Sequence, residues 1–321
     1  MKGKINISVK DRFISFNFTL ERNVTILTGD SGTGKSTLIN MVKNFSKSGK
    51  SSGVTLKCDK SCIVLEDSKY WEMELEDTHE SVVFVEESTP FLTSYDFARR
   101  IKNSDNYYVL VSREPLPQIP YSIDSIKQIR KNGKKSTFEN IYKNTSVKDI
   151  SDFPYELAII EDSKTGFQFY TKASEGTDME CISSNGKSGI IDLLNKNKNK
   201  KVLIIADSAA LGSEIRKLVY FKEKLQDKTD FFLPESFEWL ILRSDIFSGS
   251  ADIQEILENP VDYIDCQEYF SWEQFFTILL VNSTKGKANL EYPKNKSQLP
   301  SGYLNESNID KILNAMKIKK K

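Results

Sequence analysis

Short apolar runs separated by polar segments make up most of the first 125 residues. Between residues 4 and 20 apolar and polar positions alternate, which predicts two antiparallel strands. Helices are expected to begin at residue 36 and to cover 94–101. Strands that alternate with helices predict an α/β domain with a mostly parallel sheet. The continuously apolar runs that predict its buried strands are 23–28, 54–56, 62–65, 82–85 and 107–111.

The second half of the chain repeats this alternation. Apolar runs predict four more strands, at 157–160, 179–183, 201–205 and 231–233. Helices are expected at 189–195, 211–225 and 234–242, and helical segments dominate the end of the chain. The pattern therefore predicts a first α/β domain at 1–125, a basic linker at 126–152, a second α/β domain at 153–250 and a helical C-terminal extension at 251–321.

Charge and composition narrow the classes of partner. The 321 residues carry 45 Lys and Arg against 45 Asp and Glu, so the net charge does not call for a polyanionic partner. No apolar stretch reaches the roughly 18 residues of a membrane span. The four scattered cysteines suit a reducing cytosol, so we expect a cytoplasmic protein with no membrane partner. The single histidine, His79, argues against chemistry that needs histidine pairs or histidine metal clusters.

The glycine-rich segment 29–36 carries the strongest chemical signal. Its sequence, Gly-Asp-Ser-Gly-Thr-Gly-Lys-Ser, matches the G-x-x-x-x-G-K-[S/T] spacing and lies between a predicted strand and a predicted helix. The N–H groups of such a loop bind phosphate, while Lys35 reaches the terminal phosphates and the Ser36 hydroxyl ligates Mg²⁺. We therefore expect a P-loop that binds a nucleoside triphosphate and Mg²⁺. The expected nucleotide-binding residues here are Gly29, Asp30, Ser31, Gly32, Thr33, Gly34, Lys35, Ser36 and Thr37.

P-loop enzymes complete this site with acids at the end of a neighbouring strand. Glu86 and Glu87 directly follow the apolar run 82–85. We expect Glu86 to hold Mg²⁺ and Glu87 to polarise the attacking water, so the expected catalytic residues of this site are Glu87 and Lys35. The pair Glu66-Asp67 follows the run 62–65 in the same way and remains an alternative.

The next predicted strand and the missing motifs narrow the class of nucleotide. Arg113 follows the run 107–111 and is either a further nucleotide-binding residue or a partner in a surface ion pair. An Asn-Lys-x-Asp guanine motif is absent, which favours ATP, and a Leu-Ser-Gly-Gly-Gln signature is absent as well. The stretch 82–122 is similar to compact bacterial ATPases found on mobile elements. A small-molecule phosphotransferase is disfavoured, because no second basic cluster for a substrate phosphate is evident.

Two carboxylates in the second half also follow predicted strands. Glu161 comes after the run 157–160, and Asp207 comes shortly after the run 201–205. In a parallel sheet both side chains lie at the carboxyl edge, where ligands bind. A divalent cation held there activates water or stabilises a phosphate in its transition state. We therefore expect Glu161 and Asp207 to be metal ligands and catalytic residues.

This arrangement resembles the TOPRIM domain of topoisomerases, primases and OLD-family nucleases, in which a strand-end Glu precedes Asp-x-Asp-x-x-Gly. Glu161, Asp207 and Gly212 match that pattern, whereas Ala209 replaces the second Asp. The resemblance covers roughly residues 155–245 and implies metal-dependent processing of nucleic acid. The lost ligand leaves two interpretations open. One is a nuclease in which another acid compensates; the other is a degenerate domain that binds DNA or a protein. The candidate replacements are Asp162, Glu214, Glu235 and Glu238.

The order of the domains adds to this resemblance. An N-terminal ATPase followed by a TOPRIM domain is the layout of OLD-family proteins, which links the chain by analogy to defence against phage. The lysines of the expected linker and of the tail 317–321 are available to contact DNA phosphates without sequence specificity. ATPases of this type often complete their site from a second subunit, so a homo-oligomer is a further hypothesis.

Overall fold

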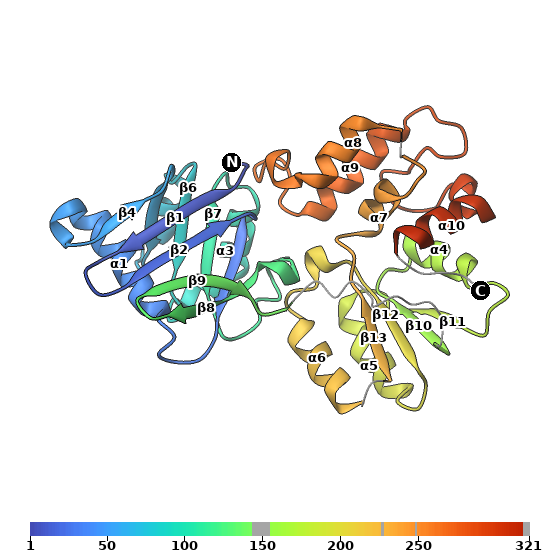
Figure 1. Cartoon of the computed structure of the whole chain (residues 1–321), viewed down its shortest axis with the longest axis horizontal. Helices are drawn as coiled ribbons and strands as arrows, with labels where there is room; N and C mark the ends of the chain where they lie inside the picture. The colour runs from blue at the N-terminus through green and yellow to red at the C-terminus, as the bar shows by residue number, and fades with distance from the viewer. Residues whose placement is uncertain (143–154, 226–227, 248, 317–321) are drawn as a thin grey trace. The chain divides into compact units, whose positions relative to one another are not determined.

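The computed structural model describes residues 1–142, 155–225, 228–247 and 249–316, which fold into two compact units (Figure 1). Unit 1 comprises Met1–Lys143 and Asn259–Ser271, and unit 2 comprises Asn144–Glu258 and Trp272–Lys321. The expected C-terminal extension is therefore divided, because its segment 259–271 belongs to unit 1. There the Gly3 N–H donates to the Val261 carbonyl at 2.9 Å. Among the described residues, no helix has the length and apolar character needed to cross a bilayer.

Unit 1 is built on a nine-stranded sheet in the order β4-β1-β2-β9-β8-β3-β7-β6-β5. From β8 to β5 every neighbouring pair is parallel. The remaining pairs are antiparallel except β2–β9. The α/β class with a mostly parallel sheet is thus confirmed. The bounds are β1 Ile5–Lys10, β2 Ser15–Leu20, β3 Val24–Thr28, β4 Thr55–Lys57, β5 Ser61–Leu65, β6 Ser81–Val85, β7 Tyr107–Val111, β8 Ile126–Asn132 and β9 Lys135–Asn140.

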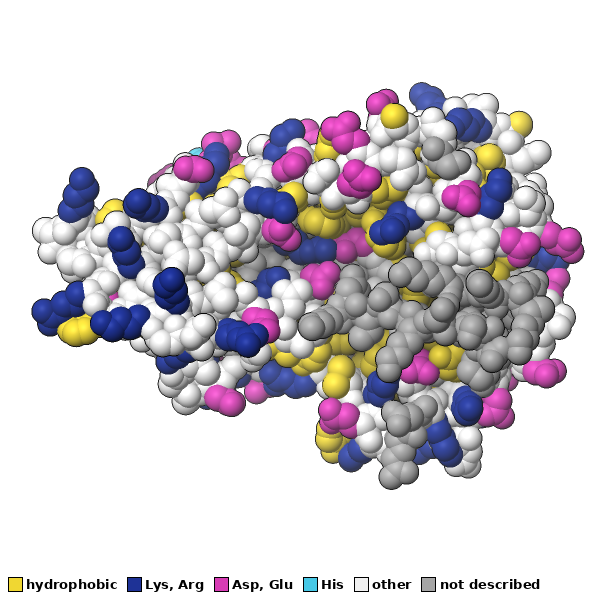
Figure 2. Space-filling model, viewed as in Figure 1, with side chains coloured by type: hydrophobic (Ala, Val, Ile, Leu, Met, Phe, Trp, Pro, Cys, Tyr) yellow, Lys and Arg dark blue, Asp and Glu magenta, His cyan; other side chains and the backbone are white. Residues whose placement is uncertain are grey.

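The basic stretch expected to be a linker is instead part of this sheet. Strands β8 and β9 form an antiparallel hairpin, and β8 pairs in parallel with β3, the strand that leads into the glycine-rich loop. Ile126 and Ile129 are buried, while the charged side chains between and after them are mostly exposed. The strand is therefore apolar at only a few positions. Because the rest of it is basic and polar, its sequence resembles a solvated linker, and the prediction of a linker was wrong. Figure 2 shows Lys and Arg side chains spread over this part of unit 1. The linker residues 143–154 lie outside the described part.

Helix α1 (Lys35–Ser48) covers one face of the sheet. Its buried side chains Leu38, Ile39, Met41 and Val42 join a core cluster with residues of β1, β2, β3, β6 and β7. The short helix α2 (Trp71–Glu76) and helix α3 (Tyr95–Lys102) follow, and the Trp71 ring stacks on Phe91 with centroids 4.3 Å apart. Single 3₁₀ turns connect the larger elements, at Gly49–Ser52, Pro90–Thr93 and Ile123–Ser125.

Unit 2 contains a second sheet, of four parallel strands in the order β11-β10-β12-β13. The register aligns Ile160 with Ile205, so the chain leaves β10 and β12 at the same edge of the sheet. β10 and β12 are buried along their whole length, as expected for central strands covered on both faces. The bounds are β10 Leu157–Ile160, β11 Glu180–Ser183, β12 Val202–Ile205 and β13 Thr229–Phe232.

Seven helices lie in the described part of unit 2. They are α4 Thr165–Ala173, α5 Ile190–Lys196, α6 Ile215–Lys224, α7 Phe237–Arg243, α8 Ala251–Glu258, α9 Trp272–Thr284 and α10 Glu306–Ala315. Helix α7 packs against α8, α9 and α10, so the end of the chain contributes to the core of this unit. The predicted helical character of the C-terminal part is confirmed.

Candidate functional site

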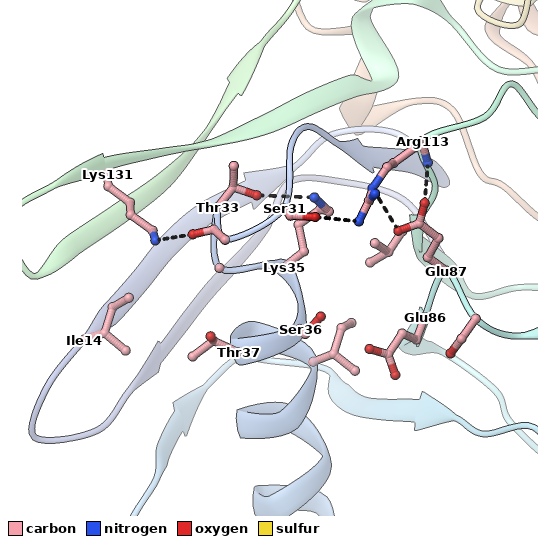
Figure 3. Close-up of a pocket in the computed structure, with 15 residues that line it drawn as sticks. Ile14, Ser31, Thr33, Lys35, Ser36, Thr37, Glu86, Glu87, Arg113 and Lys131 are labelled. Carbon is pink, nitrogen blue, oxygen red and sulfur yellow. Dashed lines mark hydrogen bonds and ion pairs between the residues drawn. The ribbon is translucent and has the colours of Figure 1, made fainter.

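The glycine-rich loop forms one wall of a cavity of about 560 Å³ in unit 1. Residues 31–37 line it from the loop and from the start of α1, while Glu86, Glu87 and Arg113 line it from the ends of β6 and β7 (Figure 3). Glu86 and Arg113 follow parallel strands of the same sheet, so both reach the edge at which β3 enters the loop. The structure thus brings the predicted phosphate loop and the predicted acids together.

The backbone of the loop requires glycine at two positions that face this cavity. Gly32 has φ +78° and Gly34 has φ +107°, a region in which a residue with a side chain is strained. Gly34 is also the N-cap of α1, and its carbonyl accepts the Leu38 N–H at 3.0 Å. The unpaired N–H groups at this helix N-terminus therefore lie beside the cavity, which makes it favourable for an anion.

Lys35 places a buried cation inside the curve of the loop. Its side chain is almost inaccessible, and its Nζ donates to the Gly29 carbonyl at 2.5 Å and to the Asp30 carbonyl at 2.8 Å. A third contact joins Nζ to the Thr33 hydroxyl at 3.3 Å. Burial, and then the positive charge of Arg113, lower the pKa of Lys35 from its ordinary value. The ammonium is therefore fixed by the loop that surrounds it and is incompletely neutralised.

At one end of the cavity Arg113 links the acids to the loop. Its Nε lies 3.3 Å from Glu87 Oε2, and its backbone N–H donates to Glu87 Oε1 at 3.3 Å. Its Nη2 donates to the Ser31 hydroxyl at 3.2 Å (Figure 3). Arg113 therefore makes the ion pair that was one of its two interpretations, and it also contacts the glycine-rich loop; its role as a nucleotide-binding residue stays a prediction.

The oxygen donors beside this end suit a magnesium ion. The Ser36 hydroxyl belongs to an exposed residue on the first turn of α1, and the half-buried Glu86 carboxylate points into the same cavity (Figure 3). Mg²⁺ prefers hard oxygen ligands and keeps several waters, so one hydroxyl and one carboxylate beside bound phosphates are an adequate protein contribution. The residues present therefore fit the expected ion.

The alternative acidic pair, Glu66-Asp67 at the end of β5, lies outside the cavity. The Glu66 carboxylate accepts ion pairs from Lys43 at 2.6 Å and Lys47 at 2.7 Å, both on α1. Hydrogen bonds from these lysines lower the pKa of Glu66. Glu66 and Asp67 are not among the residues that line the cavity, whereas Glu86 and Glu87 are. The geometry therefore favours the β6 pair.

The cavity is also lined by five residues that were not predicted as site residues: Ile14, Ile39, Ser88, Val111 and Lys131. Ile14 lies in the turn between β1 and β2, and Lys131 lies near the end of β8 (Figure 3). The Lys131 Nζ donates to the Gly32 carbonyl at 2.9 Å. A position more than ninety residues after the loop has no local signal that points to it, because only the pairing of β8 with β3 brings it there.

In unit 2 Glu161 and Asp207 follow neighbouring parallel strands, as the sequence predicted from their spacing. Burial, and then the negative charges of Glu273 and Asp162, raise the pKa of Glu161. Burial also raises the pKa of Asp207, and Glu273 and Glu238 add to the effect. The Asp207 carboxylate accepts the Phe237 N–H at 3.0 Å. The two carboxyls therefore share one negatively charged neighbourhood.

A lysine provides the cation of this neighbourhood. The Lys296 Nζ lies 3.0 Å from Glu238 Oε1 and 2.8 Å from Glu273 Oε1. Glu238 is almost completely buried and also accepts the Tyr292 hydroxyl at 2.8 Å. The ammonium raises the charged fraction of Asp207 by its attraction, and the acids in turn raise the pKa of Lys296. Lys296 and Glu273 lie far from Asp207 in sequence, so only the fold could reveal them.

The other acids proposed as replacement ligands have different partners. Asp162 accepts the N–H groups of Gly166 at 3.0 Å and Phe167 at 2.7 Å at the start of α4. Glu214 pairs with Lys217 at 3.2 Å. Ala209, at the position of the absent Asp, is buried. Within residues 1–142, 155–225, 228–247 and 249–316, no group of three or more His, Cys, Asp or Glu side chains is arranged to hold a metal ion. The donor set of unit 2 therefore does not fit the two-Asp metal site of the resemblance.

Comparisons with known proteins give no family for this chain. The sequence matches no protein-family model, and no curated protein is similar enough to it to be a relative. The chemistry of both units has to be judged from their own residues. The cavity of unit 1 brings a glycine-rich loop, a buried lysine and two acids together in one place.

Proposed function

We propose that unit 1 binds a nucleoside triphosphate with Mg²⁺ and hydrolyses it, with ATP as the expected nucleotide. The observation that supports this most strongly is one cavity lined by the glycine-rich loop, Lys35, Ser36, Glu86 and Glu87. Loops of this spacing bind phosphate through backbone N–H groups, and the strand-end acids supply the remaining chemistry. A chance glycine turn would not place two acids from a separate strand on the same cavity.

Each side chain then has a role that follows from its position. Lys35 neutralises the terminal phosphates, because its ammonium is held inside the loop. Ser36 and Glu86 would hold Mg²⁺, which supplies charge neutralisation at the phosphates when it is bound. Glu87 accepts a proton from the attacking water, and Arg113 orients its carboxylate through both oxygens.

Phosphate release from MgATP by the full chain tests this proposal. Lys35→Ala removes the buried cation, and we expect the loss of measurable turnover together with strongly weakened nucleotide binding. Lys43→Ala is the matched control, because Lys43 is on the same helix but faces Glu66 rather than the cavity. Turnover that survives in Lys35→Ala and disappears in Lys43→Ala would contradict the assignment.

For unit 2 we propose the degenerate interpretation, a TOPRIM-like domain that binds DNA or a protein partner without cleaving nucleic acid. Two observations favour it over a nuclease: Ala209 offers no ligand, and the Lys296 ammonium supplies positive charge within the carboxylate neighbourhood. The alternative is that unit 2 is a nuclease controlled by nucleotide binding in unit 1. The OLD-like order of the domains suggests this alternative, together with a role in defence against phage. Nucleotide binding in unit 1 would then control what unit 2 binds.

Supercoiled DNA distinguishes these two forms of the proposal. The full chain is incubated with the DNA, ATP and either Mg²⁺ or Mn²⁺, and nicked product is measured on a gel. The proposal predicts no nicking above the level of Glu161→Ala. Nicking that disappears in Glu161→Ala and in Asp207→Asn would establish the nuclease instead.

A further inference from the structure

The lysine that the fold adds to the cavity of unit 1 lies directly on the phosphate loop. The Lys131 Nζ donates to the Gly32 carbonyl at 2.9 Å, and the side chain is exposed. Its Cε is 3.4 Å from the place that a Cβ on Gly34 would occupy. The stem of this lysine therefore packs against the backbone of Gly34, the third glycine of the motif.

The two ends of the cavity differ in how their cations are neutralised. Arg113 lies at the end formed by β6 and β7, and its positive charge is neutralised by an ion pair with the Glu87 carboxylate. Lys131 lies on the opposite side of Lys35 from Arg113, beside Thr33 (Figure 3). Within the described part of the chain Lys131 forms no ion pair, and the carbonyl of Gly32 is its hydrogen-bond partner. A cation held by a neutral acceptor at the rim of an anion site is available for an anionic ligand.

A count of charges indicates which ligand would use it. A nucleoside triphosphate carries about four negative charges and the Glu86 carboxylate adds one, of which Mg²⁺ offsets two and Lys35 one. Because Arg113 is paired with Glu87, about two negative charges remain for other cations. Lys131 can neutralise part of this charge. It lies at the end of the cavity away from the acids that are proposed to act on the terminal phosphate.

We propose that Lys131 is a nucleotide ligand that binds the phosphates near the nucleoside. This inference rests on the proposed function of unit 1. On binding, the Lys131 ammonium exchanges the Gly32 carbonyl, its acceptor at 2.9 Å, for a phosphate oxygen.

Titration calorimetry of the full chain with MgATP and with MgADP tests the proposal in wild type, Lys131→Met and Lys134→Met. A hydrogen bond to a charged group at an exposed position predicts that Lys131→Met weakens both nucleotides by about tenfold. Lys134 is the matched control, since it is in the turn of the same hairpin but does not line the cavity. We expect its variant to bind within about twofold of wild type, and Lys131→Arg to restore most of the affinity.

The outcomes are separable. Wild-type affinity in Lys131→Met overturns the assignment of Lys131, and so does a loss confined to MgATP, because that result places the lysine at the terminal phosphate. Equal losses in the Lys131 and Lys134 variants also overturn it, since they indicate a general effect of surface charge. If the wild-type protein itself binds neither nucleotide, the proposed function fails and not only the role of Lys131.

Discussion

Replacing Glu87 by Gln separates the binding of ATP from its hydrolysis. Arg113 contacts both carboxylate oxygens, at 3.3 Å through Nε and at 3.3 Å through its backbone N–H. Gln has the same shape and keeps an oxygen for the backbone N–H, but its amide nitrogen cannot accept from Nε, so the ion pair with Arg113 is lost. The variant also loses the basic oxygen that accepts a proton from water. Loss of a general base lowers a rate by about 100- to 10,000-fold, or about 3–5 kcal/mol of transition-state stabilisation.

Binding should move in the opposite direction and by much less. The Glu87 side chain is 36% exposed, so solvent screens its repulsion of a bound triphosphate. Removing this charge should tighten MgATP binding by less than about 1 kcal/mol. The assay is phosphate release at saturating MgATP together with calorimetric titration of the same samples. Glu66→Gln is the control, because Glu66 pairs with Lys43 and Lys47 outside the cavity. Full turnover in Glu87→Gln, with loss in Glu66→Gln, would refute the choice of acids.

Three further predictions concern unit 2. Lys296→Met leaves the buried Glu238 without its cation, so urea unfolding should show a loss of about 3 kcal/mol, and an unchanged midpoint would contradict the ion-pair network. Asp162→Ala removes the acceptor for two N–H groups of α4 and should cost about 1 kcal/mol in the same assay, with no loss if α4 is capped otherwise. Burial and neighbouring acids raise the folded-state pKa values of Glu161 and Asp207, so their stabilising effect is complete below the unfolded value of about 4 and is lost as the pH rises. Asp207→Asn should therefore flatten the fall in melting temperature with rising pH, and an unchanged profile would show that Asp207 does not titrate there.

Features that are contiguous in sequence were predicted well. The glycine-rich segment 29–36 does lie between a strand and a helix, as its flanking sequence predicted, while its binding of phosphate stays a prediction. The apolar runs 82–85 and 107–111 became β6 and β7 within one residue of their expected bounds. Fully buried central strands carry a continuous apolar signal, which explains this success.

The misses have a common physical origin in partial burial and in long-range contact. The hairpin β8–β9 has one solvated face, and its Lys and Arg side chains concealed the buried Ile126 and Ile129. Lys131 reaches the phosphate loop only because β8 pairs with β3. Lys296 joins the acids of unit 2 from a segment after α9. Neither hydrophobic periodicity nor motif spacing predicts these long-range contacts, because they depend on the tertiary fold.

The central claim is that the cavity of unit 1 holds a triphosphate between main-chain amides and one buried lysine. Titration of the full chain with ATP in the presence of Mg²⁺, followed by calorimetry, tests it most directly. We expect saturable binding of one nucleotide per chain, which Lys35→Ala abolishes and Lys43→Ala preserves. No heat from the wild-type protein at about millimolar ATP, where even an affinity of about 4 kcal/mol is detectable, would contradict it.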